Sequence, residues 1–205
     1  MGFGLLFIGY LFMYSFPYNG FDVLPDLIGF IIAFFGVRTL ADYGCGWDVL
    51  KRYFTIILPS SAVTLLFQVL GLLGVDIGFT VIWDYIYTAF LLVYNILLLV
   101  AIYKIADDTD VKSIKAKAQR NLILGIGYYA LMLFFNFPIS FVQKLREYLS
   151  ANYSLGLILF IFGYLWLFFN ISVIFSCYMW ICKEGDEDMP ERERKFLKKQ
   201  EKEEE

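Results

Sequence analysis

Six stretches of apolar residues alternate with shorter polar stretches along the chain, a pattern typical of a membrane protein. A helix needs about 17 to 25 apolar residues to cross the hydrocarbon core of a bilayer. The last four stretches reach this length and the first two are at its lower limit. We therefore expect an all-α fold, a polytopic membrane helical bundle with six transmembrane helices. The stretches are 1–16, 23–40, 54–75, 79–105, 121–142 and 154–183.

The distribution of lysine and arginine predicts the orientation of these helices, because short cytoplasmic loops carry an excess of basic residues. When successive stretches cross in alternate directions, 15 of the 17 basic residues fall on the side of the two termini. The opposite side has only Lys144 and Arg146. Both termini are therefore expected in the cytoplasm, which requires an even number of crossings.

The first two stretches leave an alternative open. A re-entrant hairpin over residues 1–40 would enter and leave on the cytoplasmic side and give the same charge distribution. Six spans are favoured over four spans plus this hairpin, because non-helical backbone within the membrane is tolerated only where protein or an aqueous cavity shields it. The Asn19-Gly20 turn is then expected at the outer surface.

The chain divides into a transmembrane helical domain, residues 1–183, and a charged cytoplasmic tail, residues 184–205. Two cytoplasmic connections combine apolar and charged residues at helical spacing. Trp47, Leu50 and Phe54 recur in the first, and lysines surround Val111 and Ile114 in the second. We expect both to lie flat along the lipid headgroups.

Composition argues against an enzyme. The chain has 60% hydrophobic and 18% charged residues, mean hydropathy +0.64 and no histidine. Histidine is the most frequent general base and metal ligand, and none of the usual intramembrane protease or phosphate-binding motifs occurs. Cys45, Cys177 and Cys182 have no metal-ligand spacing, and the net charge of −3 gives no reason to expect nucleic acid. No cofactor or metal is expected.

Each of the last five stretches carries a row of small or polar residues along one helical face. This row has two interpretations. Membrane helices associate through small residues and interhelical hydrogen bonds, so packing is one. A polar path for an ion or a small solute is the other, because intramembrane polar residues face a bundle interior or water. The polar positions singled out in this way are Gln68, Asn95, Asn136 and Asn170.

Acidic residues near the expected outer surface are candidates for interaction with a cation. They are Asp22, Asp26 and Asp84. Each also has a structural interpretation. Asp22 and Asp26 lie at a predicted helix start, where acidic side chains are stabilised, and Asp84 lies between Trp83 and Tyr85 of an interfacial aromatic belt.

The segment NGFDVLPDLIGFIIAFFGVRTL, residues 19–40, resembles a segment of uncharacterised small multi-pass membrane proteins of Gram-positive bacteria. The matching residues are Asp22, Pro25, Asp26, Ile28 and Gly29, an Asp-x-x-Pro-Asp-x-Ile-Gly pattern. The resemblance covers about a tenth of the chain. It implies a bacterial cytoplasmic membrane and no particular activity.

Two functional hypotheses follow from these patterns. The favoured one is a non-catalytic membrane module that binds or regulates another membrane protein, with a membrane-protein partner or a second copy of the chain on its surface. The alternative is a subunit of a transporter or channel for a small solute or an ion. In both, the lipid bilayer surrounds the protein.

Overall fold

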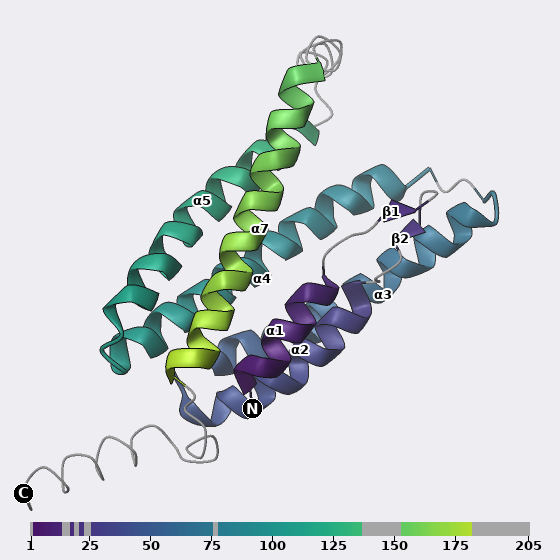
Figure 1. Cartoon of the computed structure of the whole chain (residues 1–205). Coiled ribbons are helices and arrows are strands. Elements are labelled where there is room, and N and C mark those ends of the chain that lie inside the picture. The colour runs from purple at the N-terminus through teal and green to yellow at the C-terminus, as the bar shows by residue number, and fades with distance from the viewer. Residues whose placement is uncertain are drawn as a thin grey trace, which may run out of the picture.

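The predicted helical bundle is confirmed by the computed structural model, which describes residues 2–13, 17–18, 21–22, 26–75, 78–136 and 153–181 (Figure 1). Six α-helices lie in these ranges. They are α1 (Gly2–Phe12), α2 (Asp26–Leu40), α3 (Trp47–Leu72), α4 (Thr80–Asp108), α5 (Lys112–Asn136) and α7 (Tyr153–Ile181). Strands β1 (Pro17–Tyr18) and β2 (Phe21–Asp22) pair antiparallel between α1 and α2, and the 3-10 helix η1 (Ala41–Tyr43) follows α2.

Three of the described helices are long and apolar enough to cross a membrane, as expected of a membrane protein. They are α3, α4 and the part of α7 from Ile161 to Ile181. The first two helices are shorter than the sequence predicts. The 11 residues of α1 and the 15 of α2 extend for about 16 and 22 Å, less than the roughly 30 Å of a hydrocarbon core. The two strands extend the chain from these helices toward the turn between α3 and α4 (Figure 1).

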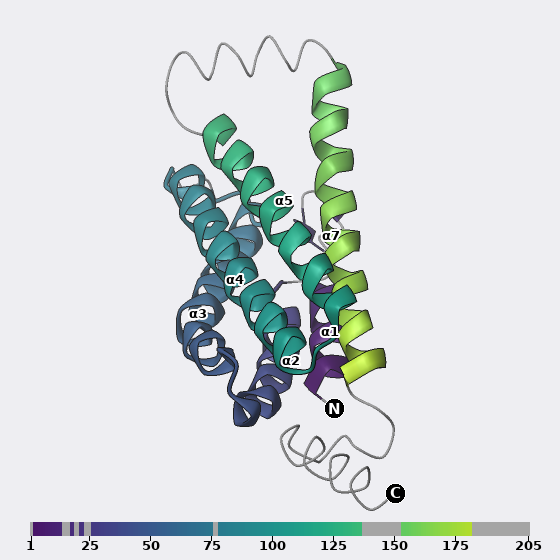
Figure 2. The ribbon, with the colours of Figure 1, turned by 90° about the vertical axis from the view of Figure 1, so that its left-hand side faces the viewer.

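The helices form a closed ring in which each one packs mainly against two neighbours. The order around the ring is α1, α2, α3, α4, α5, α7 and back to α1. Figure 2 shows α5 between α4 and α7. Gly4 of α1 lies 3.6 Å, measured from an ideal Cβ, from Tyr178 near the end of α7. The start of α1 and the end of α7 therefore lie at the same end of the bundle.

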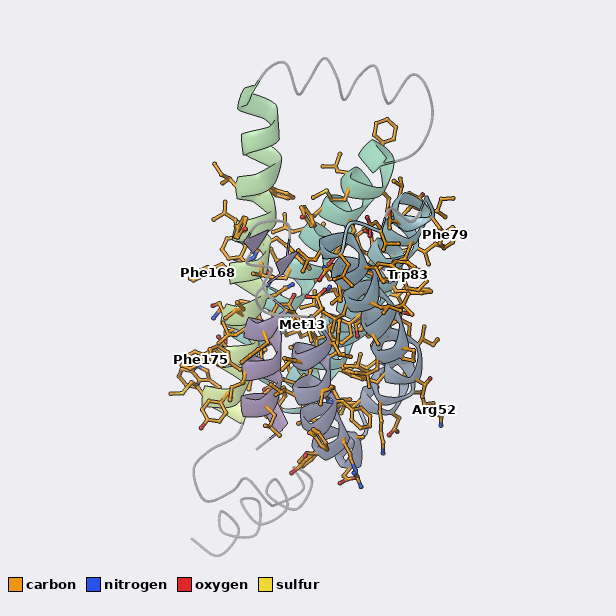
Figure 3. The ribbon with its side chains drawn as sticks, turned by 90° about the vertical axis from the view of Figure 1, so that its right-hand side faces the viewer. Met13, Arg52, Phe79, Trp83, Phe168 and Phe175 are labelled. Atoms are coloured by element: carbon orange, nitrogen blue, oxygen red, sulfur yellow. The ribbon has the colours of Figure 1, made fainter. Side chains whose placement is uncertain are left out.

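We call this end the basic end, because Arg38, Arg52, Lys104 and Lys115 belong to the helix ends and turns that lie there. Figure 3 shows Arg52 at this end and Phe79 and Trp83 near the other. Lys115 forms an ion pair with Asp107 across the turn between α4 and α5. This hydrogen bond to the carboxylate raises the pKa of the Lys115 ammonium group.

Two sequence predictions about the cytoplasmic connections are wrong. Trp47, Leu50 and Phe54 do not lie flat on the headgroups, because they form the first turns of α3 and are almost completely buried in the core. Ile114 is likewise buried in the first turn of α5. The helices α3 and α5 begin well before the apolar stretches seen in the sequence. The residues of these first turns therefore belong to the bundle, and neighbouring helices cover their apolar faces. The tail, residues 184–205, lies outside the described residues.

Candidate functional site

Polar side chains from four helices meet inside the ring, where they form one hydrogen-bonded network. Tyr10 of α1 donates its hydroxyl hydrogen to Oδ1 of Asn95 of α4, over 2.8 Å. Nδ2 of Asn170 of α7 donates to the Tyr10 hydroxyl oxygen, over 2.9 Å. Nδ2 of Asn95 donates to the Tyr129 hydroxyl of α5, over 3.0 Å. The Tyr10 hydroxyl thus joins two asparagines that are 75 positions apart in sequence.

The network continues from Asn170 toward the basic end. Nδ2 of Asn121 of α5 donates to Oδ1 of Asn170, over 3.1 Å, and the Trp166 indole donates to the Asn121 backbone carbonyl, over 3.0 Å. Asn121 and Asn170 are 0% and 1% exposed, so these amides are removed from lipid and water alike. Arg120 reaches Oδ1 of Asn121 from the bundle surface at 3.4 Å and stacks over Phe169.

The local helix geometry explains why these residues point inward together. Tyr10 follows Gly9, whose contact with α2 brings the two backbones so close that a Cβ on Gly9 would lie 2.7 Å from the Ala33 nitrogen. On the α5 side, an added Cβ at Gly125 would lie 2.8 Å from the Trp166 indole nitrogen. Small residues thus allow the close approach that side-chain hydrogen bonds between helices require.

The other half of the ring interior is aromatic. Phe30 of α2 and Phe54 of α3 pack edge-on against Tyr94 of α4, with ring centroids 5.0 and 5.7 Å apart from it. The Tyr94 hydroxyl and the Trp47 indole nitrogen are buried without a hydrogen-bond partner among the described residues. An unpaired buried polar group costs about 1–3 kcal/mol, so this half of the core carries a stability cost that the polar half does not.

Asp26, at the first turn of α2, is not one of the residues whose hydrogen bonds to one another are described above. It accepts a hydrogen bond from the Tyr87 hydroxyl of α4, over 2.8 Å, which links the two helices across the ring. The acidic residue in the first turn is the one that the sequence predicts at this helix start. Tyr87 is not one of the candidate residues, because nothing in the sequence places it opposite Asp26.

The remaining candidates are not brought into this interior network. Asp84 is exposed on α4, and Gln68 is half-buried in the second half of α3, where it forms no hydrogen bond with any described residue. The side chains of Asp22 and Asn136 lie outside the described part, as does the predicted loosening of the fifth span at Pro138. Of the seven candidates, the network contains Asn95 and Asn170.

Four members of the network are absent from the sequence-based candidates: Tyr10, Asn121, Tyr129 and Trp166. Each is polar or amphipathic within an apolar stretch, and this is the only signal that marks them. Among the described residues, the hydrogen bonds of the network join amides, hydroxyls and an indole to one another and to backbone carbonyls, and no carboxylate, thiol or histidine takes part in them. Its chemistry is that of helix association. Comparison of the chain with known protein families, with curated proteins and with solved structures finds no match.

Proposed function

We propose that this chain is a non-catalytic membrane module that binds another membrane protein through the second half of α3. The observation that carries the proposal is how little of α3 is covered by its own chain. Of its most apolar 18-residue window, 17% is buried, against 39% for the corresponding window of α4. Val69 and Leu72 are both at least 40% exposed. We call this surface, together with Gln68 and Gly71, the α3 face.

The α3 face has two features that a purely lipid-facing helix does not need. Gln68 carries an amide that makes no hydrogen bond with a described residue, and an unsatisfied amide within a membrane is costly. A Cβ on Gly71 would meet nothing within 4 Å, so the surface beside it is open. A partner helix that approaches Gly71 closely would supply a hydrogen bond to Gln68, the combination by which membrane helices associate.

Co-purification after gentle detergent extraction tests this proposal. We expect a stoichiometric membrane-protein partner with the wild-type chain and its loss with Gly71→Leu, because the added side chain blocks close approach. Gly127→Leu is the matched control, since Gly127 of α5 also has open space around it and lies on another face. A partner that stays bound to the Gly71→Leu variant, or a wild-type chain that purifies as a monomer, would contradict the proposal. A mass of twice the chain would identify a second copy as the occupant.

A second candidate function is transport of an ion or a small solute. The position of polar side chains inside the ring, with Asp26 of α2 hydrogen-bonded to Tyr87 of α4, favours it. It predicts flux in proteoliposomes that Asp26→Asn abolishes without unfolding the protein. The first proposal is better supported, because the amides of Asn121 and Asn170 hydrogen-bond to each other and the Asn95 amide hydrogen-bonds to the Tyr10 and Tyr129 hydroxyls. These groups are therefore already engaged within the protein. Absence of flux with a broad panel of cations would count against transport.

We further propose a bacterial cytoplasmic membrane as the location, with both termini in the cytoplasm and six crossings. The common end shared by Gly2 of α1 and Ile181 of α7 supports an even number of crossings. The basic residues at that end support the cytoplasmic assignment. The shortness of α1 and α2 keeps the alternative of four crossings plus a re-entrant hairpin over residues 1–40 open to test, because neither helix alone is as long as the hydrocarbon core is thick.

A further inference from the structure

A groove of about 580 Å³ lies on the surface of the α1–α2 pair, near the basic end. Leu5 of α1 and Ile32 and Phe35 of α2 form its apolar part, and Arg38, Thr39 and Asp42 form its polar part. Phe35 is 51% exposed, so this wall faces the surroundings of the protein. Volumes of about 300 to 1,000 Å³ are usual for sites that hold small molecules.

The polar part of the groove carries one positive and one negative charge. Arg38 and Asp42 are four positions apart, where α2 continues into η1, so both lie on one side of the helix. Both are exposed, and neither forms an ion pair with a described residue. Thr39 donates its hydroxyl hydrogen to the Phe35 carbonyl, over 3.1 Å, which leaves its oxygen free to accept a hydrogen bond.

We propose that this groove binds a phospholipid whose headgroup carries both a phosphate and a primary ammonium group, as phosphatidylethanolamine does. The Arg38 guanidinium binds the phosphate, for which its planar fork of donors is suited. Asp42 and the Thr39 oxygen accept hydrogen bonds from the ammonium group. One acyl chain lies against Leu5, Ile32 and Phe35.

The charge pair decides between headgroups. An anionic headgroup such as phosphatidylglycerol satisfies Arg38 equally well, but its net negative charge then lies beside the Asp42 carboxylate. A phosphocholine headgroup has no N–H to donate to Asp42 or Thr39. The arrangement of Arg38 and Asp42 therefore predicts a preference for the aminophospholipid over both.

Native mass spectrometry of the purified chain, equilibrated in detergent with equal amounts of phosphatidylethanolamine and phosphatidylglycerol, measures this preference. We expect the wild-type chain to retain mainly phosphatidylethanolamine. Arg38→Gln should weaken retention of both lipids by about tenfold, the loss expected for one charge-assisted hydrogen-bonded contact. Asp42→Asn should abolish the preference and leave retention of phosphatidylglycerol at least as high. Arg52→Gln, an exposed basic residue outside the groove, is the matched control and should change neither.

Thermal unfolding of each variant shows whether it is folded. Arg38→Lys serves as a second variant, which keeps the positive charge and loses the planar fork of guanidinium donors. Retention of phosphatidylethanolamine by a folded Arg38→Gln variant at the wild-type level would overturn the proposal. A wild-type chain that retains phosphatidylglycerol as well as or better than phosphatidylethanolamine would overturn it as well. Neither result depends on the α3 face, which lies on another helix.

Discussion

The Tyr10 hydroxyl and the Tyr94 hydroxyl are chemically identical and almost equally buried, yet their surroundings differ. Tyr10 donates to Asn95 and accepts from Asn170, so its hydroxyl joins α1, α4 and α7. Tyr94 lies among Phe30 and Phe54, and its hydroxyl has no partner among the described residues. The same atom therefore contributes to stability at one position and reduces it at the other.

This contrast predicts opposite results from one chemical change. Tyr10→Phe leaves Oδ1 of Asn95 and Nδ2 of Asn170 each short of a hydrogen bond and should lower the free energy of unfolding by about 1 kcal/mol. Tyr94→Phe removes an unpaired hydroxyl and should leave stability unchanged or raise it. Thermal unfolding in detergent micelles, followed by circular dichroism, measures both. Equal destabilisation by the two variants would contradict the assignment of the network to helix association.

Sequence reasoning identified part of this network and missed the rest for a physical reason. Asn95 and Asn170 were found because an amide in an apolar stretch is costly unless it faces a partner. The identity of the partner depends on which helices are neighbours and on their relative height, and neither is encoded locally. The sequence alone does not distinguish Tyr10 from any interfacial aromatic residue. Its role becomes visible only when α7 is placed beside α1.

At the scale of the helices, the α1–α2 pair depends on glycine. Gly29 lies so close to α1 that an added Cβ would be 2.7 Å from the Gly9 carbonyl oxygen, and Gly36 meets the Gly2 carbonyl oxygen at the same distance. These contacts are with backbone, which cannot rotate away as a side chain can. The small residues that the sequence shows along the second stretch therefore serve packing in α2.

Gly29→Ala should separate the two helices and lower the free energy of unfolding by about 1–3 kcal/mol, the usual cost of overpacking. Gly127→Ala is the matched control. It adds the same methyl group to a helix where nothing lies within 4 Å, and it should raise stability by about 0.5–1 kcal/mol. Thermal unfolding of both variants in one detergent gives the comparison. If Gly29→Ala were as stable as Gly127→Ala, the close packing of α1 on α2 would be wrong.

Helix type was predictable along most of the chain, but helix ends were not. The apolar stretches indicate where a helix contacts lipid or core, but they do not mark where the helix begins. The helices α3 and α5 begin 7 and 9 residues before their apolar stretches. Asp48, Lys51 and Arg52 are exposed on the same turns that bury Trp47 and Leu50. Such a mixed segment looks the same in sequence whether its apolar face meets headgroups or another helix.

At the scale of the whole molecule, the closed ring explains why a bundle with short first helices holds together. Each helix has two neighbours, and α1, the shortest, is held by backbone contact with α2 and by the hydrogen bond of Tyr10 to α7. Figure 3 shows Phe168 and Phe175 on the outer side of α7, where both rings are exposed, although the Phe175 ring also packs against Phe7 of α1. The ring thus encloses the hydrogen-bonded network and presents apolar side chains such as Phe168 on its surface.

The number of crossings is decided by labelling single cysteines with a membrane-impermeant maleimide on intact cells, in a background with the three native cysteines changed to serine. Gly78→Cys, in the turn before α4, should react from outside, whereas Ser113→Cys, at the start of α5, should react only after permeabilisation. These two positions test the orientation that the basic residues predict. Asn19→Cys then separates the two arrangements of residues 1–40. Six crossings place it at the outer surface, where it should react as Gly78→Cys does, and a re-entrant hairpin keeps it within the membrane, where the reagent does not reach it.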